Sequence, residues 1–156
     1  MNLASAFADS ARKNPGKTAL FWGDRAYSYA ELEDQALFVA DLLQRHFRVS
    51  PGDRVALWLK NCPEFVPALL GILHAGAAAV PINNFLKPDE VNYVLHDAGI
   101  DVIIADGELS AHYQTLKAER PALKLLDSHR FYSHAPLAIQ TRFSCRYWMR
   151  PWKPTR

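Results

Sequence analysis

Short apolar runs alternate with longer amphipathic stretches over most of this sequence, and this alternation constrains the fold more than any other feature. The first run is apolar on both faces, as expected for a central strand of a parallel sheet, and the later runs are also expected to form strands. The runs occupy residues 55–59, 77–82, 101–105 and 123–126. Because helical patterns separate them, the order β-α-β-α-β-α-β predicts an α/β fold with right-handed crossovers and helices on both faces of the sheet.

Two smaller elements precede this alternation. Residues 3–13 carry apolar side chains at helical spacing, and Pro15-Gly16 should end the helix. Residues 18–22 and 25–28 resemble two short strands. The Gly23-Asp24 pair between them predicts a two-residue hairpin turn of type II′ or I′.

The first long helix should begin with a capping box. Ser28 and Glu31 have the S-x-x-E spacing in which each side chain accepts a hydrogen bond from the other residue's backbone amide. After them, apolar residues recur at intervals of three and four, which predicts one buried helix face. These residues are Leu32, Ala36, Val39, Ala40, Leu43 and Phe47.

The second helix of the alternation has a less regular start. Asn61 is the predicted N-cap, with Glu64 three residues later, and Gly76 should close the helix. Pro67 disturbs this pattern, since a proline inside a helix removes a backbone hydrogen bond at a cost of about 3 kcal/mol. Either the helix kinks at Pro67 or its regular part begins there.

The remaining helices have clearer ends. Pro88 suits the first position of a third helix that runs to about Asp97, and Gly99 suits the residue after its C-cap. Residues 110–119 should form a last helix, which Pro121 stops.

Charge divides the sequence into two unlike segments. Residues 1–127 hold all 16 acidic residues and 12 of the 18 basic ones, for a net charge of −4, whereas residues 128–156 hold six basic residues and no acid. The second segment also lacks glycine, and we expect no helix or strand in it. We therefore predict a globular unit at residues 1–127 and a separate basic tail at residues 128–156.

The cysteines and the N-terminus predict a cytoplasmic protein. Two thiols, Cys62 and Cys145, do not indicate a disulfide framework, and the first 17 residues lack the apolar region of a signal peptide. The most apolar stretch, residues 65–82, contains two prolines and a histidine. A helix followed by a strand explains it better than a membrane span.

Five segments, in order and at matching spacing, carry a resemblance to one family. They are SYAEL at residues 28–32, VSPGDRVA at 49–56, NCPEF at 61–65, LHAGA at 73–77 and VPIN at 80–83. Over residues 3–126 the chain resembles the N-terminal portion of the AMP-forming adenylating enzymes, and most of all the fatty acyl-CoA ligases. The resemblance implies an incomplete version of that family's large N-terminal domain.

The resemblance also implies a two-step reaction. A carboxylate attacks the α-phosphate of ATP to give an acyl-adenylate and pyrophosphate, and the thiol of CoA then displaces AMP. The family uses a Ser/Thr/Gly-rich loop ending in lysine to hold the phosphates, together with Mg²⁺, a ribose-binding acid and a lysine in a C-terminal lid.

No such phosphate loop can be found here. The seven glycines never lie within four residues of each other, so a glycine-rich cradle of backbone amides cannot form. We therefore predict no catalytic, cofactor-binding or metal-binding residue in this chain. ATP, Mg²⁺ and CoA are expected only for the intact family, and the truncated chain should be inactive alone.

Several residues could suggest a site, but each has a simpler structural explanation. His74 should be a satisfied, partly buried histidine, and Asp53 should stabilise the Pro-Gly turn before it. Cys62 lies beside a helix start, which can lower a thiol pKa, yet a lone thiol there is more often inert. The Asp89-Glu90 pair should interact favourably with a helix dipole. The set His129, His134 and Cys145 matches no common zinc spacing.

The tail admits three explanations. Its composition favours translation out of frame, while a genuine disordered tail is the plainer alternative. The third is a nucleic-acid or membrane-surface arm, for which six unorganised cations give only weak, salt-sensitive attraction. The cations Arg130, Arg142, Arg146, Arg150, Lys153 and Arg156 interleave with the aromatic residues Phe143, Tyr147, Trp148 and Trp152.

An incomplete sheet has a physical consequence. It leaves an unpaired strand edge and apolar surface, which could pair with the rest of a ligase or with a second copy. An interaction module is therefore the alternative to an inactive fragment.

Overall fold

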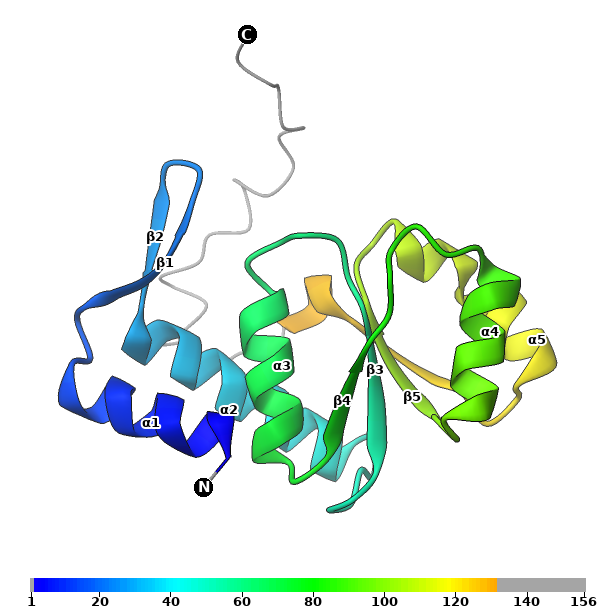
Figure 1. Ribbon diagram of the computed structural model, residues 1–156, viewed down its shortest axis with the longest axis horizontal. Coiled ribbons are helices and arrows are strands. Elements are labelled where there is room, and N and C mark those ends of the chain that lie inside the picture. The colour runs from blue at the N-terminus through cyan, green and yellow to red at the C-terminus, as the bar shows by residue number, and fades with distance from the viewer. Residues whose placement is uncertain (1, 132–156) are drawn as a thin grey trace, which may run out of the picture.

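The structure is a computed structural model that describes residues 2–131. Its helices and strands follow one another in the predicted order (Figure 1). They are α1 (Leu3–Lys13), β1 (Thr18–Trp22), β2 (Arg25–Ser28), α2 (Tyr29–Arg45), β3 (Arg54–Trp58), α3 (Phe65–His74), β4 (Ala78–Pro81), α4 (Pro88–Asp97), β5 (Val102–Ala105), α5 (Tyr113–Glu119) and β6 (Lys124–Asp127). Short 3-10 turns precede α5 at Leu109–His112 and follow β6 at Ser128–Phe131.

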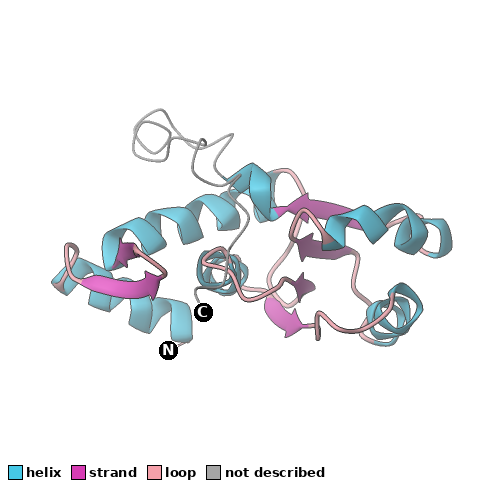
Figure 2. Ribbon diagram, turned by 90° about the horizontal axis from the view of Figure 1, so that it is seen from above, coloured by secondary structure: helices cyan, strands magenta, loops and turns pink. Residues whose placement is uncertain are grey.

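The strands β3 to β6 form one parallel sheet in the order β4-β3-β5-β6. Parallel neighbours need a crossover connection, and α3, α4 and α5 supply it. Figure 2 shows the strands lying between helices, which confirms the predicted α/β architecture. β3 and β5 are each paired on both sides, and this explains why their residues are apolar on both faces.

Alternate residues of β3 supply the two cores. Val55 and Leu57 pack with α2 and α3 on one face, while Ala56 and Trp58 pack with α4 and the α5 region on the other. All four side chains are at most 1% exposed. Since full burial of one large apolar side chain contributes about 1.5–3 kcal/mol, this strand is the centre of the fold's stability.

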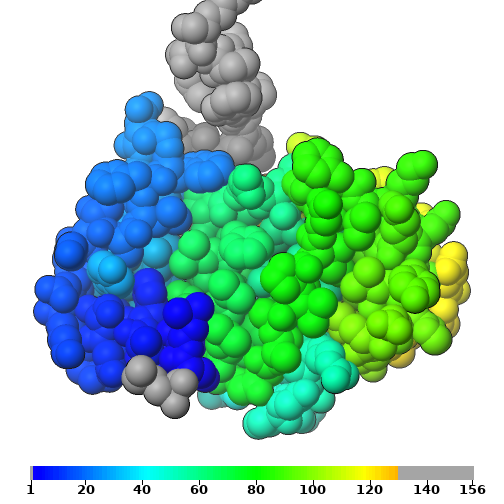
Figure 3. Space-filling view, viewed as in Figure 1, coloured from blue at the N-terminus to red at the C-terminus, as the bar shows by residue number. Residues whose placement is uncertain are grey.

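The N-terminal elements pack at one end of the sheet unit. Ala4 of α1, Ala36 of α2 and Leu70 of α3 form a small third core. Figure 3 shows the result: the N-terminal residues, in blue, form one end of the molecule, and the α4–α5 region, in green and yellow, forms the other.

Of the two predicted hairpin turns, the structure is compatible only with type II′. Trp22 pairs with Arg25, which leaves the predicted two-residue loop. Gly23 has φ +56°, whereas Asp24 is not among the described residues with positive φ. A type I′ turn needs positive φ at both positions, so the second of the two predicted turn types is excluded.

The predicted capping box of α2 is confirmed. The Ser28 hydroxyl accepts from the Glu31 amide at 3.2 Å, and the Glu31 carboxylate accepts from the Ser28 amide at 2.8 Å. The predicted apolar stripe is buried from Leu32 to Leu43, but its last member, Phe47, is wrong as a helical residue, because α2 ends at Arg45 and Phe47 is half-buried after it.

The predicted N-cap at Asn61 is wrong. The helix α3 begins at Phe65, and its N-cap Glu64 makes no capping hydrogen bond through its side chain. Two tight turns precede the helix, with Phe65 N donating to Cys62 O at 3.2 Å and Val66 N to Pro63 O at 3.4 Å. Pro67 is therefore the third helical residue, where no intrahelical donor is lost and no kink is needed.

Two other predictions need correction. The strand β4 is not a buried strand over residues 77–82, because it spans only Ala78–Pro81 and both of its end residues are exposed. It is an edge strand of the described sheet, which is where a proline that lacks an N–H is tolerated. The last helix begins as a 3-10 turn at Leu109 and becomes α-helical only at Tyr113.

The tail predictions lie almost wholly outside the described residues. His134, Cys145 and five of the six tail cations fall at residues 132–156, and the boundary at residue 127 stays a prediction. The described start of the tail, Ser128–Phe131, forms a 3-10 turn, so the expectation of no helix there is wrong for that turn. Among residues 2–131, no helix is both long and apolar enough to span a bilayer.

Gly71 provides a test of the α2–α3 packing. A Cβ added at this position would lie 2.6 Å from Val39 Cβ and 2.8 Å from Ala36 O, so the two helices touch through the glycine. Alanine gains up to about 1 kcal/mol of helix propensity, but overpacking costs about 1–3 kcal/mol. We expect Gly71→Ala to lower the free energy of unfolding, measured by urea denaturation, by about 1–2 kcal/mol.

The matched control is Gly16→Ala, because a Cβ at Gly16 meets nothing within 4 Å. It should change stability by less than about 0.5 kcal/mol. Equal effects of the two substitutions would contradict the close helix contact.

Candidate functional site

The order of the strands places a candidate site at the carboxyl ends of β3 and β5. The chain leaves β3 toward β4 on one side, and β5 adds on the other side of β3. In open parallel sheets ligands bind at such a switch point, outside the carboxyl ends of the strands. The residues that follow β3 and β5 therefore decide what this part of the molecule can do.

Asp106 joins the two strand ends. Its carboxylate accepts from the backbone amide of Lys60 at 3.0 Å, and also from those of Glu108 at 3.1 Å and Leu109 at 3.0 Å. Three backbone donors fill most of the acceptor capacity of a carboxylate. Asp106 is thus a structural cross-link that also starts the 3-10 turn before α5. This role of Asp106 was not predicted from the sequence, although an Asp-Gly pair directly after a buried strand is a signal of a turn.

Lys60 follows β3, and its side chain reaches Glu108, which follows β5. Its ammonium pairs with the Glu108 carboxylate, which raises the pKa of Lys60 through a hydrogen bond and through its charge. With Asp106 beside this pair, the three side chains carry a net charge of −1. These three side chains therefore do not form a cationic cluster of the kind that binds phosphates.

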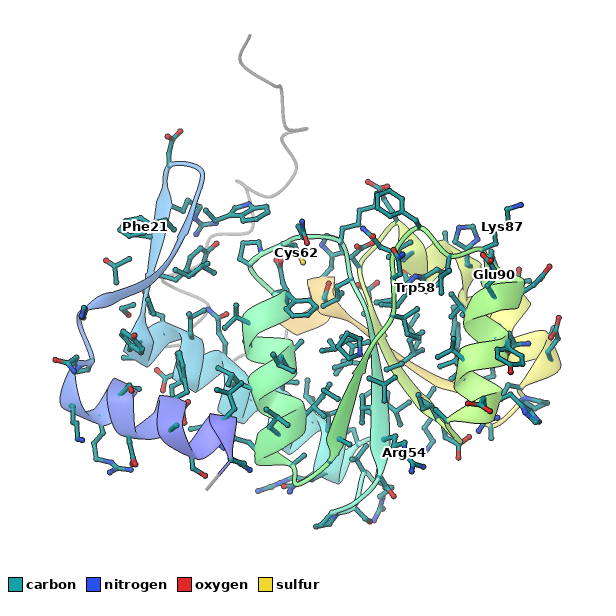
Figure 4. The ribbon with its side chains drawn as sticks, viewed as in Figure 1. Phe21, Arg54, Trp58, Cys62, Lys87 and Glu90 are labelled. Atoms are coloured by element: carbon teal, nitrogen blue, oxygen red, sulfur yellow. The ribbon has the colours of Figure 1, made fainter. Side chains whose placement is uncertain are left out.

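A second group of ionisable side chains surrounds the start of α3, where Figure 4 labels Cys62. Burial, followed by the charge of Glu64 and a hydrogen bond to it, raises the pKa of the Cys62 thiol to about 12. Cys62 therefore stays protonated at neutral pH and is a poor nucleophile. This agrees with the inert thiol favoured by the sequence and excludes a lowered pKa.

Glu64 and Tyr27 complete this group. The Glu64 side chain is 6% exposed, and burial raises its pKa. Burial also raises the pKa of Tyr27, which is 2% exposed, with Glu64 contributing in the same direction. Burial thus disfavours the charged form of each of these three side chains, which is unlike the arrangement of an activated nucleophile.

Trp58 ends β3 on the opposite face of the sheet. It is 1% exposed, and its ring centroid lies 6.0 Å from that of His112. Its indole N–H has no acceptor within residues 2–131. From the sequence, Trp58 was expected only as an apolar residue of the buried strand. The apolar pattern of β3 does not indicate that the indole N–H lacks an acceptor.

The residues singled out from the sequence do not converge on one site. His74 lies between α3 and α2 with its Nε2 3.1 Å from Glu33 Oε1, and its side chain is 18% exposed. Asp53 accepts from the Ser50 amide at 2.7 Å and so stabilises its turn, as predicted. No group of three potential metal ligands occurs within the described part of the chain.

The Asp89-Glu90 pair is part of the α4 cap. The Glu90 carboxylate accepts from the Lys87 amide at 2.8 Å, and Asp89 is exposed in the first helical turn. Figure 4 shows Lys87 and Glu90 at the start of α4, away from Cys62. Both carboxylates lie in the first turn of α4, so a favourable interaction with the helix dipole explains the pair, as predicted.

The fold is that of the N-terminal domains of adenylate-forming ligases. The chain is similar to the N-terminal domain of FACL13 from Mycobacterium tuberculosis, with a TM-score of 0.77 and 26% identity over 86% of this chain and 36% of that one. It is also similar to the anthranilate CoA ligase AuaEII, whose structure was solved with anthranoyl-AMP. There the TM-score is 0.76 and the identity 29%, over 81% of this chain and 25% of that one.

The chain belongs to the AMP-binding enzyme family, whose family model matches residues 7–146. Over 102 residues it is 37% identical to the long-chain-fatty-acid–CoA ligase of Bacillus subtilis, covering 65% of this chain and 18% of that protein. Over 129 residues it is 32% identical to surfactin synthase subunit 3 of the same organism, covering 83% of this chain and 10% of that protein. The chain thus spans less than a quarter of the length of these relatives.

Glu64 gives a pH test of the buried group. Because its pKa is raised in the folded state, the folded chain binds more protons than the unfolded chain above the unfolded pKa of about 4.3. The Glu64 contribution to stability is then full below that pH and is lost as the pH rises toward the raised pKa. We expect Glu64→Gln to flatten this fall in the free energy of unfolding, measured by urea denaturation across that range.

Asp34→Asn is the control, since Asp34 is exposed on α2. It should leave the pH profile of the parent unchanged. A Glu64→Gln profile that still follows the parent would show that Glu64 titrates normally.

Proposed function

We propose that this chain corresponds to the N-terminal part of an AMP-forming acyl-CoA ligase and activates no carboxylic acid by itself. The family match over residues 7–146 supports the first part of this proposal. The long-chain-fatty-acid–CoA ligase, with 37% identity, supports a fatty acid as the substrate of the complete reaction. A cytoplasmic location is part of this proposal, and Cys62, which forms no disulfide within residues 2–131, is compatible with it.

The complete reaction would require ATP, Mg²⁺ and CoA, and the described residues do not fit these groups. The lysine at the switch point is paired with Glu108, and three backbone donors occupy most of the acceptor capacity of the neighbouring Asp106. Gly107, at the carboxyl end of β5, faces the His129 ring, whose Nε2 lies 2.6 Å from the position of an added Cβ. That space is filled, so the backbone there does not form an open cradle for phosphates.

The observation that carries the proposal is the Lys60–Glu108 pair beside Asp106. Phosphoryl transfer depends on positioned cations and amide donors that offset negative charge in the transition state. Here the cation is paired with an exposed carboxylate, and three backbone amides are already bonded to Asp106. The role that remains for residues 2–131 in the family reaction is that of a scaffold.

An ATP–pyrophosphate exchange assay tests this proposal. The purified chain, supplied with Mg-ATP, labelled pyrophosphate and long-chain fatty acids or benzoate, should give no exchange above a protein-free blank. The control is an intact acyl-CoA ligase measured in the same buffer. Exchange that depends on both the chain and an added acid would contradict the proposal.

A further inference from the structure

The amino ends of the parallel strands lie on the far side of the sheet from the switch point. Figure 4 shows this separation, with Arg54 at the start of β3 and Trp58 and Cys62 toward its other end. A hollow with a volume of about 250 Å³ lies at these amino ends. It is lined by the segment after α2, by the residues that lead into β3 and β5, and by the first residue of β6.

Cations outnumber acids in the lining of this hollow by three to two. The cations are Arg48, Arg54 and Lys124, and the acids are Asp53 and Asp101. The hollow therefore has a net positive charge, although residues 1–127 as a whole carry a net charge of −4. A concave surface with charge of one sign attracts ligands of the opposite sign.

Two of the cations are held by backbone carbonyls and not by carboxylates. Arg54 donates from Nη1 to Ala98 O at 3.2 Å, and Lys124 donates from Nζ to Phe47 O at 3.0 Å. Neither side chain forms an ion pair within residues 2–131. A carbonyl oxygen holds such a head group in place but does not cancel its charge, so both cations can attract an anion.

The two acids offset only part of this charge. Asp101 pairs with Arg120, whose Nη2 lies 2.9 Å from Asp101 Oδ1, and Asp53 accepts from the Ser50 amide at 2.7 Å. With Arg120 included, four cations stand against two acids, which leaves a net charge of +2. The carboxylates have defined roles in the fold, whereas the excess of cations has none.

Arg48 is the third cation, and its backbone does not explain its presence. It is the only non-glycine residue among residues 2–131 with a positive φ, at +61°. Asparagine and aspartate adopt this conformation more readily than arginine. Arg48 is exposed and has no ion-pair partner in the described part of the chain. Residues held in such a conformation are concentrated at functional sites.

We propose that this hollow binds a small polycarboxylate anion. The three cations come from three separate segments, so a ligand with its charges on separate carboxylates can meet more than one of them. A phosphate group instead concentrates about −1.5 to −2 charges on one centre, close to the two acids of the lining. Ligand pockets usually have volumes of about 300–1,000 Å³, and this smaller hollow suits an anion smaller than a nucleotide. The proposal does not depend on ligase activity.

Nuclear magnetic resonance of the full-length chain tests the proposal, with citrate as the probe. Citrate should shift the amide signals of Gly52 and Gly99, which line the hollow, and the shifts should saturate. Arg48→Gln should weaken the citrate affinity about fivefold, because it removes one cation without breaking an ion pair. Lys124→Gln should have a similar effect, and Lys124→Arg, which keeps the charge, should restore the affinity.

Two further variants separate this site from general attraction to a basic chain. Lys17→Gln is the matched control, since Lys17 is exposed before β1 and does not line the hollow. Arg150→Gln removes a cation of the tail in the same way. Both variants should keep the citrate affinity within about twofold of the parent.

Three results would overturn the proposal. The first is the absence of saturable shifts at Gly52 and Gly99. The second is an equal loss of affinity in Arg48→Gln and in the two control variants, because citrate would then respond only to overall charge. The third is inorganic phosphate that shifts the same signals at equal or lower concentration, because the ligand class would then not be a polycarboxylate.

Discussion

The pairing of β3 with a neighbour on each side, in register with β4 and β5, is the constraint on which the rest of the structure depends. It buries both faces of the strand, so one helix layer must cover Leu57 and another must cover Trp58. The crossovers that satisfy this requirement bring the ends of β3 and β5 together at the switch point. The fold therefore determines where a site could lie before any polar residue is considered.

The side chains at the carboxyl ends of β3 and β5 then determine which ligands could bind at the switch point. The Asp106 carboxylate accepts hydrogen bonds from three backbone amides, and Glu108 forms an ion pair with Lys60. These contacts fix the two strand ends relative to each other, which suits a scaffold. They also leave a local excess of negative charge, which disfavours a polyphosphate. The same side chains thus support the fold, and the proposal that this part of the chain binds no nucleotide rests on them.

Much of the fold could be predicted from the sequence, because its signals are local. The Ser28–Glu31 box, the Gly23 turn and the alternating apolar runs each specify their element without help from distant residues. The predictions were wrong where tertiary contacts determine the start of a helix or the burial of a strand. Asn61 has the chemistry of an N-cap, but the chain enters α3 through tight turns at Cys62 and Pro63, so the helix starts later. The run at residues 77–82 is apolar, yet β4 lies at the sheet edge and is only partly buried.

The candidate site was harder to foresee for the same reason. Asp106 and Lys60 are 46 residues apart, and only the parallel pairing of β3 with β5 brings them together. The shifted pKa of Glu64 arises from burial, which no spacing in the sequence reveals. By contrast, Glu90 and Asp53 act within their own turns, and their structural roles could be predicted from neighbouring residues alone.

Isothermal titration of the purified chain with Mg-ATP tests the central claim most directly, since it measures binding without requiring the chemical step. We expect no saturable heat up to millimolar nucleotide, because Lys60 is paired with Glu108 and the His129 ring fills the space beside Gly107. A tight complex with one ATP per chain would contradict the account.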